Sequence, residues 1–155
     1  MRENFSIREI RENKAEICDE ILRALPDWFG IEQAIRNYAK AVVDFPMFIS
    51  EADGRVAGFL SLETHNPYTT EIHVMAVKQE FHRGGHGRAL VAMAEKYSQA
   101  QRAEYLMVKT VGPSGKSTEY DRTREFYENT GFRPLQELKT LWDEHNPCLI
   151  MIKRL

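Results

Sequence analysis

Hydrophobic and polar residues alternate along the chain with two different periods, and together these periods predict a mixed α/β fold. Apolar residues at every second position, or in short continuous runs, are typical of β-strands. Apolar residues at every third or fourth position, such as Ile17, Ile21 and Leu25, are typical of an amphipathic helix. We therefore expect strands at residues 5–10, 45–51, 55–63, 71–77, 105–109, 136–141 and 148–153. We expect helices at residues 14–25, 30–41, 87–101 and 121–130.

Turn residues mark several boundaries between these segments. The pair Asp53-Gly54 is typical of a tight β-hairpin. Residues 65–68, with the sequence His-Asn-Pro-Tyr, are typical of a turn or loop. Asp121 is suited to the N-cap of the last helix, and Gly131 is suited to the position just after the end of that helix.

The order of the predicted elements, β-α-α-β-β-β-α-β-α-β-β, defines the fold class more closely. The strand–helix–strand order over residues 71–109 predicts two parallel strands, because parallel neighbours need a crossover connection. The hairpins elsewhere predict antiparallel pairing. We therefore expect an α/β fold, or α+β in a broader sense, with a mixed, mostly antiparallel sheet and helices on both faces.

The length and net charge of the chain limit the number of domains and the kinds of partner that we expect. The chain has 155 residues with no repeat and no long linker, so we expect a single domain over residues 1–155. A net charge of −2 at pH 7 gives no reason to expect nucleic acid or a membrane surface as a partner. No apolar run is long enough to span a bilayer, and residues 1–4 are expected to begin a strand rather than a signal peptide.

The two cysteines, Cys18 and Cys148, stand far apart in apolar segments and form no CxxC pattern. We expect both to be small buried hydrophobic side chains rather than ligands or nucleophiles. A reducing, cytoplasmic location is the simplest expectation for such cysteines.

The most informative segment is the turn His82-Arg83-Gly84-Gly85-His86-Gly87-Arg88, which follows a predicted strand and opens a predicted helix. Glycines let a ligand approach the backbone closely, and a helix N-terminus attracts phosphate. The dinucleotide fingerprint G-x-G-x-x-G fails here at its third glycine. Residues 110–117 contain Gly-Lys-Ser, but Thr110 stands where the nucleotide-binding pattern requires its first glycine.

This glycine-rich turn resembles the coenzyme A pyrophosphate loop of the GNAT superfamily of N-acetyltransferases, in which His82 matches a position that is more often Gln or Arg. The segment Phe126-Tyr127-Glu128-Asn129-Thr130-Gly131-Phe132 resembles that family's late F-Y-x-x-x-G-F segment. The resemblance covers essentially the whole chain. It implies a central parallel strand pair that splays apart, acetyl-CoA as the co-substrate, and no metal.

The same resemblance implies a path for acetyl-CoA along one strand, the glycine-rich turn and the start of the last helix. Strand backbone would pair with the pantetheine arm, and N–H groups of the turn would hold the pyrophosphate. Tyr120 stands where many members carry a coenzyme-binding Asn, so Lys109, Thr110 or Ser117 are candidates to replace that contact. The expected coenzyme-binding residues are Met75, Ala76, Val77, His82, Arg83, Gly84, Gly85, His86, Gly87, Arg88, Thr110 and Tyr120.

Three residues are expected to handle protons. An amine must be neutral to attack a thioester, so a base has to accept its proton. Glu71 resembles the catalytic glutamate that several GNAT enzymes carry at the head of this strand, and His73 shares a strand face with it. Tyr127 matches the family's general-acid tyrosine. If these residues have only structural roles, Glu71 is a solvated carboxylate, His73 is a half-buried histidine and Tyr127 is an aromatic core residue.

We therefore expect an acetyltransferase that moves an acetyl group to a primary amine by direct attack in a ternary complex. The acceptor, a small molecule or a peptide amine, is not identified by the sequence. Aromatic residues near carboxylates suit a cationic amine, and the expected acceptor-binding residues are Trp28, Phe29, Tyr68 and Trp142. Homodimers are frequent in the family, and the oligomeric state is left open. The alternative is a non-catalytic acyl-CoA-binding or regulatory module.

Overall fold

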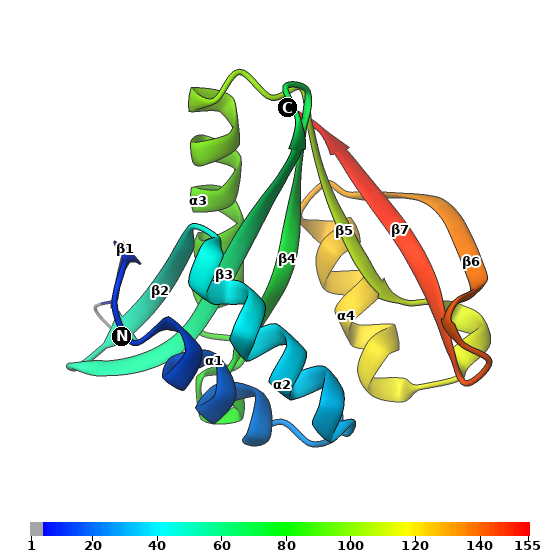
Figure 1. Ribbon diagram of the computed structural model, residues 1–155, viewed down its shortest axis with the longest axis horizontal. Helices are drawn as coiled ribbons and strands as arrows, with labels where there is room; N and C mark the ends of the chain where they lie inside the picture. The colour runs from blue at the N-terminus through cyan, green and yellow to red at the C-terminus, as the bar shows by residue number, and fades with distance from the viewer. Residues whose placement is uncertain (1–4) are drawn as a thin grey trace. The chain divides into compact units, whose positions relative to one another are not determined.

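The computed structural model describes residues 5–155, so the strand start expected at residues 1–4 lies outside the described residues (Figure 1). The strands are β1 (Phe5–Ile10), β2 (Met47–Ala52), β3 (Arg55–Asn66), β4 (Thr69–Val77), β5 (Tyr105–Val111), β6 (Arg133–Asp143) and β7 (Asn146–Arg154). The α-helices are α1 (Lys14–Arg23), α2 (Glu32–Ala41), α3 (His86–Ala100) and α4 (Thr118–Asn129). None of the helices in this part of the chain is long and apolar enough to cross a membrane.

The strands form one sheet in the order β1-β2-β3-β4-β5-β7-β6. Strands β4 and β5 run parallel, whereas β1·β2, β2·β3, β5·β7 and β6·β7 are antiparallel. The expected α/β class with a mixed, mostly antiparallel sheet is therefore confirmed. The parallel register runs from Thr69 opposite Tyr105 to Ile72 opposite Val108, which covers only the first part of each strand.

The described chain divides into two compact units. The first unit comprises residues 5–63 and 73–97, and the second comprises residues 64–72 and 98–155. Strand β4 contributes its beginning to the second unit and its end to the first. The expectation of a single domain stays a prediction.

In the first unit, alternation along β2 divides the core between two faces. Met47 and Ile49 belong to one hydrophobic cluster with residues of α1 and α2, such as Cys18, Ile21, Leu22 and Ile35. Phe48 instead contacts Tyr97 of α3, with 5.8 Å between the ring centroids. Successive strand residues point to opposite faces, so α1 and α2 cover one face of this unit's strands and α3 covers the other.

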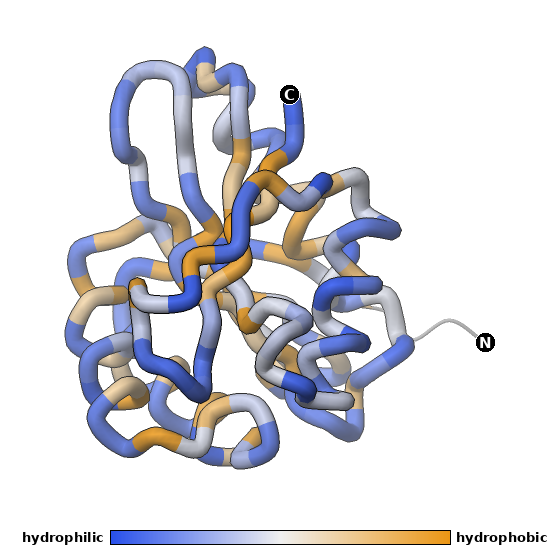
Figure 2. Tube along the Cα trace, turned by 90° about the vertical axis from the view of Figure 1, so that its right-hand side faces the viewer, coloured by the Kyte–Doolittle hydropathy of each residue, from blue (hydrophilic) through white to orange (hydrophobic). Residues whose placement is uncertain are grey.

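In the second unit, buried residues of β5 and β7 form the centre, and α4 is joined to the end of β5. The guanidinium of Arg124 in α4 donates a hydrogen bond to the backbone oxygen of Val111. Figure 2 shows hydrophobic and hydrophilic stretches alternating along the chain. Among the buried residues are Leu106, Val108, Phe132, Leu149 and Met151.

Two local expectations are confirmed and two are corrected. Asp53 and Gly54 both have positive φ, of 52° and 75°, as the predicted hairpin turn requires, and Gly131 has a φ of 103° just after α4. The helix α4 begins before Asp121, because the Ser117 hydroxyl accepts a hydrogen bond from the Tyr120 N–H and is the N-cap. Residues 65–66, expected in a loop, continue β3 up to a tight turn.

Burial of both cysteines gives a prediction about thiol reactivity. Neither thiol is in a disulfide, and both residues are fully buried, which confirms the expected packing role. Burial raises the pKa of Cys18 to about 12 and raises that of Cys148 above its usual range. At pH 8 a thiol with that raised pKa is a thiolate in roughly one molecule in ten thousand. We expect a disulfide reagent to modify the thiols slowly in the native protein and quickly in denaturant; fast native modification would contradict this.

Candidate active site

The glycine-rich turn has the backbone shape of an anion-binding loop. Arg83 and Gly85 have positive φ, of 66° and 87°, and alternate with residues of negative φ before α3 begins at His86. Such alternation turns successive N–H groups toward one side. The first N–H groups of α3 lack intrahelical acceptors, and the helix dipole adds positive potential there. Residues 82–85 and Arg88 are exposed, so a phosphate can reach these groups.

The His86 side chain points away from solvent and anchors the turn. It is buried, its Nδ1 is hydrogen-bonded to the Ser50 hydroxyl of β2, and its ring packs beside Phe5 and Phe81. This ties the turn to the core of the first unit. Because the imidazole is enclosed, only the backbone of His86 can face a ligand. A coenzyme contact through the His86 backbone stays a prediction.

His82 closes the end of β4. Its Nε2 lies 2.7 Å from the backbone oxygen of Val77 and donates a hydrogen bond to it. The rings of Trp28 and His82 pack in a T-shaped arrangement, with 5.7 Å between centroids. One lone pair of the Val77 carbonyl is therefore already used. The backbone roles expected for Met75, Ala76 and Val77 toward the pantetheine stay predictions.

Glu71 is a buried carboxylate with two basic partners. Its side chain is 6 % exposed, and its Oε1 lies 2.6 Å from Nε2 of His65 and 3.5 Å from Nζ of Lys109. A buried carboxylate needs pairing to offset the loss of hydration, and these two groups supply it. The expectation of a plain solvated carboxylate is therefore excluded for Glu71.

The parallel register explains how Lys109 reaches Glu71. Glu71 stands opposite Met107 on β5, and Lys109 lies two residues further on, hence on the same face. His65 comes from the end of β3, across the turn from β4. From the sequence, Lys109 was expected only as a candidate coenzyme contact, and His65 was expected only as part of a turn or loop. The sequence feature that could have pointed to a role for Lys109 beside Glu71 was a lysine inside an otherwise apolar strand.

His73 has different partners in the first unit. Its Nδ1 lies 3.1 Å from the Ser61 hydroxyl, and its ring packs edge-on against Phe45 and Tyr38, with centroid distances of 4.9 and 5.4 Å. The residue is half-buried. This environment resembles the plain alternative of a packed histidine, and a catalytic role for His73 stays a prediction.

Tyr127 lies in α4 and is 5 % exposed. Its ring packs between Phe126 and Phe132, with centroid distances of 5.3 and 5.4 Å. Aromatic packing therefore fixes the direction of the phenol, which a positioned general acid also needs. Thr110 is buried near the end of β5, and Tyr120 lies in the first turn of α4.

The four aromatic residues expected to bind the acceptor come from both units, and the two in the second unit are not close together. Trp28 and Phe29 pack partly against the core of the first unit. In the second unit, the backbone oxygen of Tyr68 accepts hydrogen bonds from the start of β5. The β6–β7 turn instead comes just before Cys148 in the chain, and Cys148 pairs with Val111 at the end of β5. Tyr68 and Trp142 therefore lie at opposite ends of β5, and one small acceptor cannot contact both.

The Gly-Lys-Ser segment has a structural explanation. Pro113–Gly115 forms a short 3₁₀ turn, and the backbone N–H and hydroxyl of Ser114 both donate to the Glu137 carboxylate, at 3.3 and 2.6 Å. The hydroxyl bond is the main cause of the lowered pKa of Glu137. Ser117 caps α4. The polar side chains of this loop thus fasten the β5–α4 connection.

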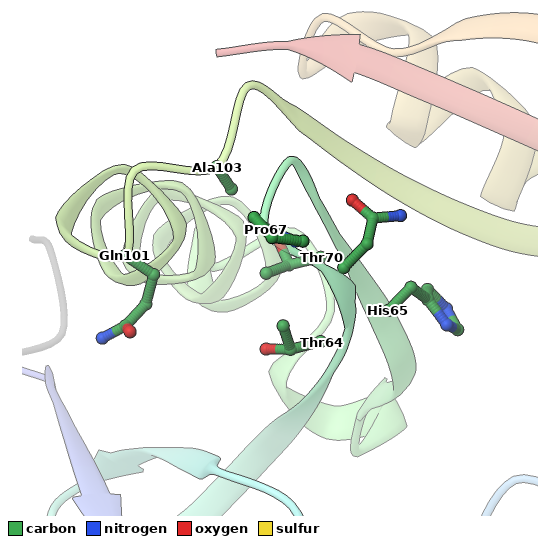
Figure 3. A pocket seen from close by; sticks show the side chains of 7 residues that line it. Thr64, His65, Pro67, Thr70, Gln101 and Ala103 are labelled. Carbon is green, nitrogen blue, oxygen red and sulfur yellow. The ribbon is translucent and has the colours of Figure 1, made fainter.

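An open pocket of about 390 Å³ lies beside the β3–β4 turn (Figure 3). Its lining is Thr64, His65, Asn66, Pro67, Thr70, Gln101 and Ala103. In Figure 3 the His65 side chain projects on the opposite side of the turn from Thr64 and Gln101. The His65 side chain is 34 % exposed, so it connects the buried Glu71 carboxylate with solvent.

Comparison with known proteins identifies the family and the fold. A family model described as an acetyltransferase (GNAT) domain matches residues 44–134, more than half of the chain. A search of the curated proteins gave no match.

Solved structures of this family superpose over nearly the whole chain. A protein described as a GNAT-family acetyltransferase from Desulfovibrio desulfuricans is 19 % identical, with a TM-score of 0.83 and coverage of 97 % of this chain and 99 % of that one. A GNAT-family acetyltransferase from Elizabethkingia anophelis with acetyl-CoA bound is 16 % identical, with a TM-score of 0.76 and coverage of 98 % and 99 %. The ribosomal-protein-S18-alanine N-acetyltransferase from Escherichia coli is 14 % identical, with a TM-score of 0.77 and coverage of 97 % and 94 %. At these identities the likeness establishes the fold.

Proposed function

The chain belongs to the GNAT acetyltransferase family, and on that premise we propose that it transfers the acetyl group of acetyl-CoA to a primary amine. The acceptor amine attacks the thioester directly while both substrates are bound. The observation that carries the proposal is Glu71, a buried carboxylate held by His65 and Lys109 on the strand expected to lead to the coenzyme.

The glycine-rich turn supports the coenzyme half of this proposal. Its two left-handed residues, Arg83 and Gly85, and the N-terminus of α3 offer backbone N–H groups to a pyrophosphate. The guanidinium groups of Arg83 and Arg88 are exposed beside the turn and would add charge-assisted contacts. The related structure from Elizabethkingia anophelis, which holds acetyl-CoA, also supports acetyl-CoA as the ligand of this chain.

Glu71 supports the chemical half. In the proposed step the amine nitrogen forms a bond to the acetyl carbon, the carbon–sulfur bond breaks, and the amine proton passes to Glu71. His65 contacts the same carboxylate and is partly exposed, so it can carry that proton onward to solvent. Lys109 offsets the negative charge of Glu71 between turnovers.

Tyr127 would complete the proton balance. The departing thiolate of coenzyme A takes up a proton, and a phenol has a basicity close to that of a thiolate. The packing of the Tyr127 ring against Phe126 and Phe132 supports a fixed position for this donor. Two buried, unpaired cysteines are compatible with a reducing compartment such as the cytoplasm.

Thermal unfolding with ligands tests the proposed coenzyme. Acetyl-CoA at 100 times its dissociation constant should stabilise the native state by about 2.7 kcal/mol. For a domain of this size that corresponds to a rise in melting temperature of roughly 5–10 °C. ATP, which matches only the Gly-Lys-Ser segment, should give no rise. A rise with ATP and none with acetyl-CoA or a longer acyl-CoA would reject the proposal.

A further inference from the structure

Lys109 places a primary amine beside the carboxylate that is proposed as the base. Its Nζ lies 3.5 Å from Oε1 of Glu71, and both residues belong to the second unit, on the parallel strands β5 and β4. The Lys109 side chain is 32 % exposed, whereas the Glu71 side chain is 6 % exposed. A primary amine, the kind of group that the proposed reaction acetylates, is therefore already held at the base and is partly open to solvent.

We propose that Lys109 is a modification site: given acetyl-CoA and no other amine, the chain acetylates its own Lys109 at Nζ. The inference rests on the proposed function, because acetyl-CoA is the donor and Glu71 is the base. The lysine nitrogen forms a bond to the acetyl carbon, and the carbon–sulfur bond breaks. Of the two protons that the ammonium group loses, one passes to Glu71 and through His65 to solvent, and the other ends on the thiol of coenzyme A.

The distance between Lys109 and Glu71 is close to the distance that the reaction requires. An acceptor that gives its proton to Glu71 must bring its nitrogen to about 3 Å from the carboxylate, and the acetyl carbon must then lie about 3–3.5 Å from that nitrogen. The Nζ of Lys109 is 3.5 Å from an oxygen of the same carboxylate. It therefore lies close to the position of an acceptor nitrogen, and the flexible four-carbon stem of lysine allows the remaining movement.

Two other lysines of the second unit have different surroundings. The Nζ of Lys153 donates a hydrogen bond to the backbone oxygen of Thr130 at 2.6 Å, and a carbonyl oxygen accepts hydrogen bonds but is not a base near neutral pH. Lys139 is exposed on β6. The residue type at position 109 also matters, because a lysine ammonium can lose its proton and become a nucleophile, whereas an arginine guanidinium stays charged. Either type would offset the charge of Glu71, but only lysine offers an amine that can be acetylated.

The self-acetylation ends after one acetyl group per chain. Its product, an Nε-acetyl-lysine, is a neutral amide that has no ammonium proton left to give to Glu71. Coenzyme A is therefore released as a burst of one molecule per chain. This burst differs from the continuing release that accompanies turnover of an added amine, so the two reactions can be measured separately.

Peptide mass spectrometry after incubation of the full chain with acetyl-CoA alone tests the proposal. Lys139 and Lys96 are exposed, so they report the direct chemical acetylation of surface lysines. We expect Lys109 to be acetylated at least about 100-fold faster than either of them, the lower end of what a positioned base contributes. Glu71→Gln should remove this difference and leave the rates at Lys139 and Lys96 unchanged.

A lysine variant gives a second readout that leaves Glu71 in place. Lys109→Arg keeps the positive charge but has no amine to acetylate, so the burst of coenzyme A should disappear, whereas the matched control Lys139→Arg should keep it. A burst that persists in Lys109→Arg would overturn the proposal, and so would acetylation of native Lys109 no faster than that of Lys139. If Lys109 stays unmodified while acetyl-CoA raises the melting temperature, only the self-acetylation is wrong. If acetyl-CoA gives no rise either, the coenzyme half of the proposed function fails with it.

Discussion

Replacing Glu71 with glutamine is expected to lower turnover by about 100- to 10,000-fold, the range that a positioned acid or base contributes. Glutamine keeps nearly the same shape but cannot take up the amine proton. Acetyl-CoA binding should remain, because the glycine-rich turn at residues 82–88 is a separate element. The measurement is the steady-state rate of coenzyme A release with a reactive amine, together with the thermal shift caused by acetyl-CoA.

Glu104→Gln is the matched control for this experiment. Glu104 is exposed, and the substitution makes the same chemical change outside the Glu71 group. Its turnover should equal that of the native protein. If Glu71→Gln also kept native turnover, Glu71 would be a structural residue and the proposed proton path through His65 would be wrong. Loss of the acetyl-CoA shift together with a lowered melting temperature of Glu71→Gln without ligand would instead indicate a folding defect.

Replacing Tyr127 with phenylalanine is the second change with a large expected effect. The aromatic contacts with Phe126 and Phe132 remain, and only the phenol hydroxyl is lost. If that hydroxyl protonates the departing thiolate, turnover should fall by about 100- to 10,000-fold with little change in acetyl-CoA binding. Pre-steady-state and steady-state rates of coenzyme A release provide the measurement.

Tyr97→Phe serves as the control for the loss of a hydroxyl. Tyr97 also packs against an aromatic ring, that of Phe48, but it lies in α3. Loss of the Tyr97 hydroxyl should leave turnover unchanged. Native rates in Tyr127→Phe would show that the tyrosine is an aromatic core residue, the plain alternative that the sequence left open. A non-catalytic acyl-CoA-binding module would show no measurable difference among all of these variants.

The parts of the fold that could be predicted from the sequence are those that depend on neighbouring residues. The alternation of apolar and polar residues with a period of two predicted β1 with its observed bounds. A residue in the left-handed conformation is common just after a helix, and this identified Gly131 as the residue that follows α4. The two consecutive residues with positive φ, Asp53 and Gly54, are what a tight hairpin needs. Each of these features depends on a few neighbouring residues, so the sequence contains the necessary information.

Features set by distant neighbours were less accessible. The first residue of α4 depended on whether Ser117 or Asp121 caps the helix, and both residue types are good caps. The partners of Glu71 depend on the parallel register that brings Lys109 beside it and on the length of β3, which carries His65. The inward direction of the His86 ring depends on Ser50, a serine 36 positions earlier in the chain.

The central claim is acetyl transfer to an amine, and a paired product measurement tests it most directly. The protein is incubated with acetyl-CoA and a panel of small and peptide amines, and free thiol and acetylated amine are quantified together, the second by mass spectrometry. We expect at least one amine for which the two products form in equal amounts and for which Glu71→Gln abolishes both. Thiol release without any acetylated amine across the panel, or at rates that Glu71→Gln leaves unchanged, would contradict the account.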